Sequence, residues 1–144
     1  MFQDIRVERS TQSNGCFSFV HLCKVMHDDG MEQITWDDFE KVDIRVGKVI
    51  NVTDFPKARN PAFILTIDFG PDIGTKVSSV QAVGAHTKEE LAGMLVCCVV
   101  NFPPKRVADF TSEVLTLGFK NNADIGWVLI TPAKGTVDLG SKLT

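Results

Sequence analysis

Cations that lie beside prolines are the side chains whose type and spacing best suit binding chemistry. Lys105 and Arg106 directly follow Pro103-Pro104. Proline fixes φ and removes the backbone donor, so this corner is expected to end the preceding strand and hold both cations in a defined place. Arg59 lies between the prolines at positions 56 and 61. Because arginine can bind a phosphate through two hydrogen bonds, these cations are candidates for an anion-binding rim, with solvated turn residues as the alternative.

Residues suited to catalysis are sparse in the sequence. His86 is the one histidine that lies outside the first 30 residues. Neither Ser78 nor Ser79 has flanking residues that would mark it as an activated nucleophile. The sequence also has no glycine-rich phosphate loop and no dinucleotide fingerprint. We therefore predict a non-catalytic protein that needs no cofactor.

The cysteines predict neither a metal site nor a disulfide framework. Two of them belong to a mixed cluster of Cys16, His21, Cys23 and His27. Zinc can take such ligands, but this spacing matches no common zinc pattern, so no metal site is expected. Cys97 and Cys98 are neighbours in a predicted strand, where adjacent side chains point to opposite faces and an ordinary disulfide would be strained. Free thiols fit a reducing, cytoplasmic location.

The composition predicts one globular domain, residues 31 to 144, after an N-terminal extension, residues 1 to 30. The 144 residues are 44% hydrophobic, and no apolar run reaches the roughly 18 residues of a membrane span. Asp4 and Glu8 interrupt the basic start, and His21 and Lys24 the apolar core, of a signal-peptide pattern. A net charge of −3 weighs against a general nucleic-acid binder, although a local basic patch could still contact phosphates.

Alternating apolar residues predict a small all-β barrel with one short helix. The first strand runs from Val42 to Val52, with a bulge expected at Gly47-Lys48. Thr87 and Glu90 have the spacing of a capping box, which predicts a short helix at 87–94. A helical turn is expected near residues 35 to 39, and the nearly continuous apolar run 94–102 should be buried on both faces. Further strands are expected at 62–69, 76–82, 114–117 and 125–130, with a late extension at 137–140.

Four sequence blocks carry a family resemblance: Asp38–Gly47, Phe55–Ala62, Ser78–Gln81 and Val99–Leu115. In this order they resemble the CsaA-type proteins, small export-related chaperones within the tRNA-binding-domain family. The resemblance runs from about Trp36 to the C-terminus and does not include residues 1 to 30. It implies an OB-fold, a five-stranded Greek-key barrel with a short helix between strands 3 and 4 and with terminal extensions.

The resemblance adds polar residues to the candidate site. In tRNA-binding members the strand that matches Ser78–Gln81 is part of the ligand face, and Asn101 and Ser112-Glu113 match positions that flank the proline corner. An ordinary solvent-facing strand is the alternative for the strand residues. The expected tRNA- or ligand-binding residues are Arg59, Ser78, Ser79, Gln81, Asn101, Lys105, Arg106, Ser112 and Glu113.

Three phenylalanines are candidates for an apolar peptide groove: Phe55, Phe102 and Phe110. If exposed, they could stack on bases or receive apolar side chains of an unfolded chain, and if buried they would belong to the core. Phe102 is expected in the core. Phe110, in a predicted loop, is expected at the surface.

Two functions are consistent with these features. Many tRNA-binding members follow the Ser-Glu pair with Gly-Met, whereas this chain has Val114-Leu115, and its 105–110 loop is more apolar and contains Asp109. These departures favour a chaperone for unfolded or export-bound polypeptides. The alternative is a tRNA-binding module that uses the basic rim and could be auxiliary to an aminoacyl-tRNA synthetase. The resemblance also implies a homodimer, with an interface that includes Trp36, Phe39, Val137 and Leu139.

Overall fold

The computed structural model describes residues 31–123 and 125–144. The chain divides into two units, Met1–Trp36 and Asp37–Thr144. The predicted N-terminal extension and its cysteine–histidine cluster lie outside the described residues. The predicted helical turn is present as α2 (Trp36–Glu40). No helix within the described ranges is long and apolar enough to cross a membrane.

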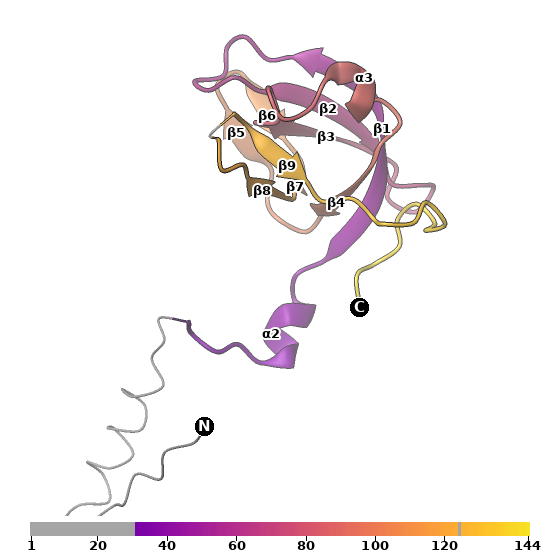
Figure 1. The fold of residues 1–144 in the computed structure, drawn as a ribbon. Helices are drawn as coiled ribbons and strands as arrows, with labels where there is room; N and C mark the ends of the chain where they lie inside the picture. The colour runs from indigo at the N-terminus through magenta and orange to yellow at the C-terminus, as the bar shows by residue number, and fades with distance from the viewer. Residues whose placement is uncertain (1–30, 124) are drawn as a thin grey trace, which may run out of the picture. The chain divides into compact units, whose positions relative to one another are not determined.

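Five antiparallel strands form the main sheet of the second unit (Figure 1). Their order along the sheet is β3-β2-β1-β4-β7. Alternate side chains of β2 are buried in the core, as the period-two pattern predicts. The five strands are β1 (Ile44–Asp54), β2 (Phe63–Asp68), β3 (Thr75–Val80), β4 (Leu95–Val99) and β7 (Leu115–Thr116).

The sheet curls until its two end strands meet. Glu113 N–H donates to the Val77 carbonyl over 2.8 Å, and inside the barrel the Thr116 hydroxyl donates to Ser78 Oγ over 2.8 Å. The short helix α3 (Lys88–Leu91) lies between β3 and β4, and its predicted capping box is formed. The result is a nearly closed five-stranded barrel with its helix between the third and fourth strands of the barrel, which confirms the predicted OB-fold class.

The irregularity in β1 lies beyond the predicted position. The register with β2 slips at Ile50, not at Gly47-Lys48. Gly47 has a packing role instead, because a Cβ built there would lie 2.4 Å from Ile67 Cγ2 and 2.8 Å from the ring of Phe69. The missing side chain therefore lets β1 pass close to the core.

The chain after β4 differs most from the prediction. β4 ends at Val99, before the proline corner, so the corner does not itself end the strand. Beyond the corner, where a loop was predicted, β5 (Lys105–Val107) and β6 (Phe110–Ser112) pair as a hairpin. Its turn holds Ala108 at a φ of 52°. Val107 and Phe110 form the pair next to the turn, and both residue types favour strands.

A second hairpin follows the barrel. β8 (Gly118–Lys120) pairs with β9 (Trp127–Leu129). β9 lies within the strand predicted at 125–130. His86 Nε2 accepts a hydrogen bond from Leu129 N–H over 3.1 Å. Gly84 and Gly126 both have positive φ. A Cβ on Gly84 would lie 2.4 Å from the Ile125 carbonyl oxygen, and a Cβ on Gly126 would lie 2.5 Å from the Val83 carbonyl oxygen. The hairpin is thus closely fitted to the loop that carries His86.

The C-terminal segment runs along the start of β1. Gly140 N–H donates to Val46 O over 2.8 Å, and Leu143 N–H donates to Ile44 O over 2.8 Å. The Arg45 guanidinium also donates to the Gly140 carbonyl over 2.9 Å. The predicted late extension is therefore attached to the barrel by backbone hydrogen bonds rather than by a full strand.

Candidate functional site

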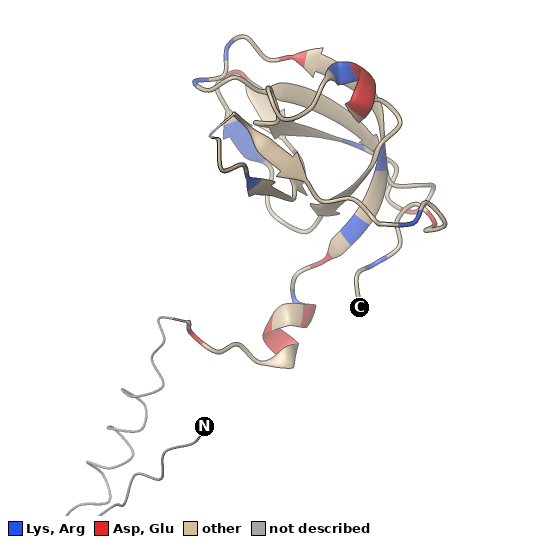
Figure 2. Ribbon diagram, viewed as in Figure 1, with Lys and Arg blue, Asp and Glu red and all other residues tan. Residues whose placement is uncertain are grey.

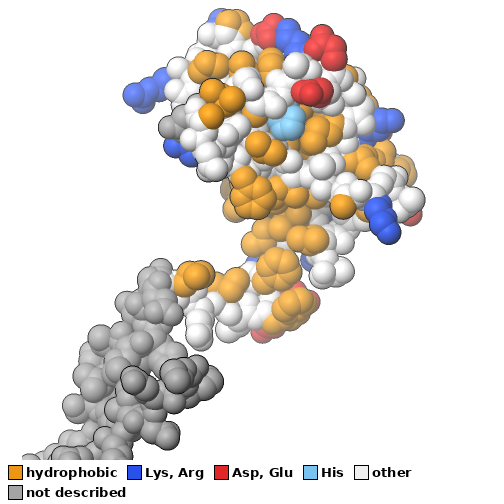
Figure 3. Space-filling view, viewed as in Figure 1, with side chains coloured by type: hydrophobic (Ala, Val, Ile, Leu, Met, Phe, Trp, Pro, Cys, Tyr) orange, Lys and Arg blue, Asp and Glu red, His pale blue; other side chains and the backbone are white. Residues whose placement is uncertain are grey.

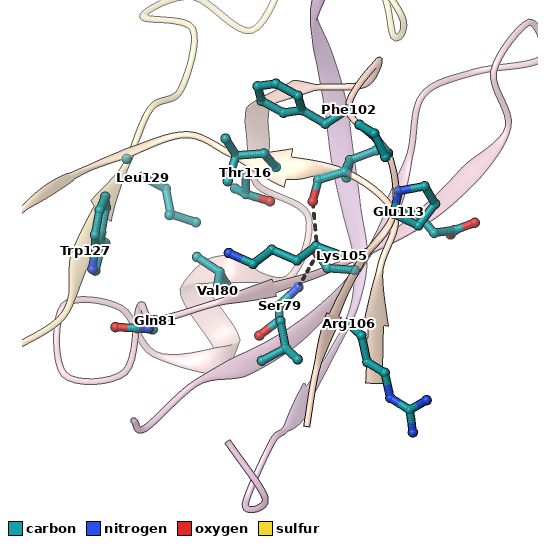
Figure 4. Close-up of a pocket in the computed structure, with 17 residues that line it drawn as sticks. Ser79, Val80, Gln81, Phe102, Lys105, Arg106, Glu113, Thr116, Trp127 and Leu129 are labelled. Atoms are coloured by element: carbon teal, nitrogen blue, oxygen red, sulfur yellow. Dashed lines mark hydrogen bonds between the residues drawn. The ribbon is translucent and has the colours of Figure 1, made fainter. Parts of the chain in front are cut away.

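An open pocket of about 870 Å³ lies where the end of β3 faces the β5–β6 and β8–β9 hairpins (Figure 4). Segments distant in the sequence meet there because the barrel closes between β3 and β7. The lining residues lie at positions 79–81, 102–107, 112–116, 118, 127 and 129.

The Ser112 hydroxyl connects two of the segments that line the pocket. It donates to the Val114 carbonyl over 3.0 Å and accepts from Ser79 N–H over 3.2 Å, as the dashed lines in Figure 4 show. The neighbouring Glu113 carboxylate accepts from Val77 N–H over 3.1 Å. Its other oxygen lies 3.8 Å from Lys76 Nζ. Ser112 and Glu113 therefore line the pocket, but their side chains are engaged within the protein.

Exposed apolar side chains form two walls of the pocket. Phe102 contributes one, and Trp127 of β9 contributes the other (Figure 4). The exposed fractions of Phe102 and Trp127 are 50% and 41%. Apolar side chains, orange in Figure 3, also reach the surface on the face that carries the β8–β9 hairpin. Such surfaces can hold apolar side chains or stack on bases.

Lys105 and Arg106 both line the pocket, but Figure 4 shows that only Lys105 directs its charge into it, whereas the Arg106 guanidinium points away. Both are exposed on β5, part of which is blue in Figure 2, and the Lys105 side chain extends into the pocket in Figure 4. Glu113, whose carboxylate is already engaged, is the only acidic residue among the described residues of the lining. Within the described ranges neither cation forms an ion pair, but Arg106 Nε donates to the Ala108 carbonyl over 3.2 Å. After the hydrogen bond from Lys57, the charge of Arg106 also contributes to lowering the pKa of Asp109. The site can therefore combine apolar contact with attraction for an anion.

A family model described as "Putative tRNA binding domain" matches residues 44–142. That range runs from the start of β1 past the end of β9 and includes the whole pocket lining. The chain belongs to the tRNA-binding domain family.

Solved structures similar to this tRNA-binding domain include two CsaA chaperone proteins. The protein from Picrophilus torridus is 46% identical, and the protein from Bacillus anthracis str. Ames is 41% identical. Each has a TM-score of 0.71, and each comparison covers 78% of this chain and 100% of the other. The predicted resemblance to CsaA-type proteins is confirmed.

Methionine–tRNA ligases are similar over a part of their length. The ligase of Pyrococcus horikoshii is 33% identical over 113 residues, and that of Parabacteroides distasonis is 38% identical over 104 residues. These matches cover 78% and 72% of this chain but 15% of each ligase. The chain thus spans only a small part of the length of those relatives.

Two further cations of this tRNA-binding domain, Lys57 and the predicted site residue Arg59, lie outside the pocket lining. Lys57 forms an ion pair with Asp109 at the turn of the β5–β6 hairpin. Its hydrogen bond and charge lower the pKa of the Asp109 carboxyl. Arg59 is exposed but does not line the pocket. The structure therefore brings only Lys105 and Arg106 to the pocket.

Ser78 is a correction to the predicted site. It is fully buried, donates to the Val114 carbonyl over 3.1 Å and accepts from Thr116. Side chains alternate along β3, so Ser78 points into the barrel while Ser79 and Gln81 border the pocket. Ser78 therefore stabilises the closure of the barrel and is not accessible to a ligand.

Asn101 connects two segments of the chain and lies outside the pocket. Its side-chain nitrogen donates to the Lys41 carbonyl over 2.6 Å, and its oxygen accepts from Asp43 N–H over 3.0 Å. Asn101 does not line the pocket. Both halves of its amide are occupied in connecting the end of β4 with the segment before β1.

Phe102 and Phe110 differ from the predicted pattern of exposure. Phe55 is buried and packs edge-on against the half-buried Phe110, with ring centroids 5.6 Å apart. Neither lines the pocket, because the hairpin folds Phe110 back onto Phe55. Phe102 is the exposed one, because β4 ends at Val99 and the chain then leaves the sheet.

Ten lining residues were not predicted as part of the site: Val80, Pro103, Pro104, Val107, Val114, Leu115, Thr116, Gly118, Trp127 and Leu129. Trp127 gave a usable signal, since a tryptophan is rarely buried completely and this one follows a glycine inside a predicted strand. Others come to the pocket only through long-range pairing, such as Thr116 on β7 and Leu129 on the β8–β9 hairpin.

Metal and thiol chemistry find no support in this region. Within residues 31–123 and 125–144, no group of three or more histidine, cysteine or acidic side chains could hold a metal ion. Burial raises the pKa of the Cys98 thiol to about 12 and also raises the pKa of Cys97. Cys98 therefore stays protonated near neutral pH, which suits a packing role better than a nucleophilic one.

Proposed function

We propose that this protein is a non-catalytic binding protein that holds unfolded or export-bound polypeptides, as a CsaA-like chaperone. The observation that carries the proposal is the open pocket with exposed Phe102 and Trp127 on its walls. Most of the lining is apolar, and apolar side chains of an unfolded chain gain free energy when such a surface covers them. The identity of 46% with a CsaA chaperone protein over that protein's whole length supports it.

A tRNA-binding module, which could act beside an aminoacyl-tRNA synthetase, is the second candidate. Lys105 and Arg106 favour it, because neither forms an ion pair with a described residue and such exposed cations can contact phosphates. Similarity to part of the methionine–tRNA ligases also supports it. The free thiols of Cys97 and Cys98 fit the cytoplasmic location proposed for either function.

Salt dependence separates the two candidates. The anisotropy of a labelled, reduced and alkylated polypeptide and of labelled total tRNA is measured with the full chain at low and at high salt. We expect polypeptide binding to persist or strengthen at high salt, because it rests on apolar burial. Binding of tRNA should weaken steeply, because neutralised phosphates release counterions.

A double variant, Lys105→Gln with Arg106→Gln, sharpens this test. If these cations contact phosphates, the salt slope of tRNA binding should fall by about 1 for each cation removed. Lys134→Gln provides a matched control, since Lys134 is exposed and does not line the pocket. Tight, salt-sensitive tRNA binding without polypeptide binding would refute the chaperone function.

We also propose a homodimer, with Trp36, Phe39, Val137 and Leu139 contributing to its interface. Trp36 has an exposed fraction of 65%, and the other three side chains are each partly exposed. Large aromatic residues often carry the binding energy of an interface. Light scattering after size exclusion should give the mass of a dimer for the full chain and that of a monomer for Trp36→Ser. A monomeric wild-type chain would refute this part of the proposal.

A further inference from the structure

The edge of β3 next to the pocket pairs only in part with the rest of the barrel. Val77 N–H donates to the Glu113 carboxylate over 3.1 Å, and the Val77 carbonyl accepts from Glu113 N–H over 2.8 Å. Val77 therefore directs its backbone groups away from β2. Backbone groups alternate between the two edges of a strand, so Ser79 and Gln81 face the same edge as Val77.

Two backbone groups on this edge are left without a partner. Ser79 N–H donates to Ser112 Oγ over 3.2 Å, and the Gln81 carbonyl accepts from Trp127 N–H over 2.7 Å. The Ser79 carbonyl and the Gln81 N–H, which lie between these bonds, have no hydrogen bond to any described residue. Both residues line the pocket. The pocket thus presents one free acceptor and one free donor of the main chain.

This pair matches the backbone of one residue in an extended chain. In a pair of parallel strands, a residue of one strand donates its N–H to the carbonyl of residue i on the other strand. The carbonyl of the same residue accepts from the N–H of residue i+2 on that other strand. Ser79 and Gln81 stand in that relation. Ser112 and Trp127 occupy the adjoining groups, so the added ladder is limited to a single residue. A side chain next to that residue can reach the walls formed by Phe102 and Trp127.

The charge of the pocket indicates what else the bound segment carries. Lys105 extends into the pocket and has no carboxylate partner among the described residues, while Glu113 is held by Val77 N–H and lies beside Lys76. An incoming carboxylate would therefore complement Lys105 without displacing an existing ion pair. Lys105 would therefore favour a polypeptide segment that carries an acidic residue over one that is purely apolar.

We propose that the pocket binds one residue of an extended, acidic polypeptide segment through that residue's own N–H and C=O. The Ser79 carbonyl accepts the first group, the Gln81 N–H donates to the second, and a nearby aspartate or glutamate of the segment meets Lys105. The inference rests on the proposed polypeptide-binding function and adds its mode of recognition. Because backbone groups are the same in every residue except proline, this mode suits a protein that holds many different unfolded chains.

An N-methyl scan of a peptide ligand tests the proposal. The probe is a fluorescein-labelled peptide of alternating valine and threonine with one central glutamate, and its affinity for the full chain is measured by anisotropy. N-methylation removes one N–H at a time and leaves the side chains unchanged. We expect one position at which methylation weakens binding about tenfold, since it leaves the Ser79 carbonyl unpaired and adds a clash, and small effects elsewhere.

The charged contact is tested with the same peptide. Replacing its glutamate by glutamine should weaken binding to the wild-type chain about fivefold, and should have little effect on binding to Lys105→Gln. Lys134→Gln should retain the wild-type response. A peptide that binds with equal affinity at every methylated position overturns the backbone inference and leaves the polypeptide-binding function standing. A peptide that does not bind at all, while tRNA does, overturns both.

Discussion

Removing both pocket aromatics, by Phe102→Ala with Trp127→Ala, should weaken the binding of an unfolded polypeptide about a hundredfold. The two side chains form opposite walls of the pocket and are 50% and 41% exposed before a ligand arrives. Their truncation removes apolar surface that a ligand would bury, while the core beneath them remains. Anisotropy with the labelled polypeptide measures the loss, and circular dichroism verifies that the double variant is folded.

Phe119→Ala is the matched control for this double variant. Phe119 lies on β8 of the same hairpin, has an exposed fraction of 71% and does not line the pocket. Its truncation should leave affinity within about twofold of the wild-type value. If Phe119→Ala were as damaging as the double variant, the outer face of the hairpin would be the binding surface. An unchanged affinity of the double variant would place the polypeptide elsewhere on the molecule.

Gly47→Ala should lower the free energy of unfolding by about 3 kcal/mol. The added Cβ would meet Ile67 Cγ2 at 2.4 Å and the ring of Phe69 at 2.8 Å, and all three positions lie where β1 passes over the fully buried core. Neither neighbour can withdraw without disturbing the packing around it. Urea unfolding followed by circular dichroism measures the change.

Gly135→Ala supplies the comparison for Gly47→Ala. A Cβ at Gly135 would have no atom within 4 Å, and the structure gives no positive φ for this residue. Its free energy of unfolding should therefore stay within about 0.5 kcal/mol of the wild-type value. Equal stability of both variants would mean that β1 can move away from the core at little cost.

The barrel could be predicted because its signals are local. Period-two alternation predicted β2, and the Thr87–Glu90 spacing predicted the capping box that precedes α3. The predicted helix extended beyond the observed Lys88–Leu91. The family resemblance, which the comparisons confirm, supplied the closure into an OB-fold.

The pocket could be predicted only in part, because long-range closure assembles it. Ser79, Gln81, Lys105 and Arg106 were named beforehand and do line it, whereas the Trp127 wall depends on how the β8–β9 hairpin fits the loop of His86. Phe102 was misplaced because the apolar run continues past Val99, although the strand does not. Whether these residues bind a ligand stays a prediction.

The tip of the β5–β6 hairpin has two attachments to the loop after β1, and only one of them is sensitive to salt. Lys57 and Asp109 form an exposed ion pair, while Phe55 and Phe110 form an aromatic contact with ring centroids 5.6 Å apart. Added salt screens the first and leaves the second intact. The aromatic contact is therefore expected to keep the tip of the hairpin attached to this loop at ionic strengths that weaken the ion pair.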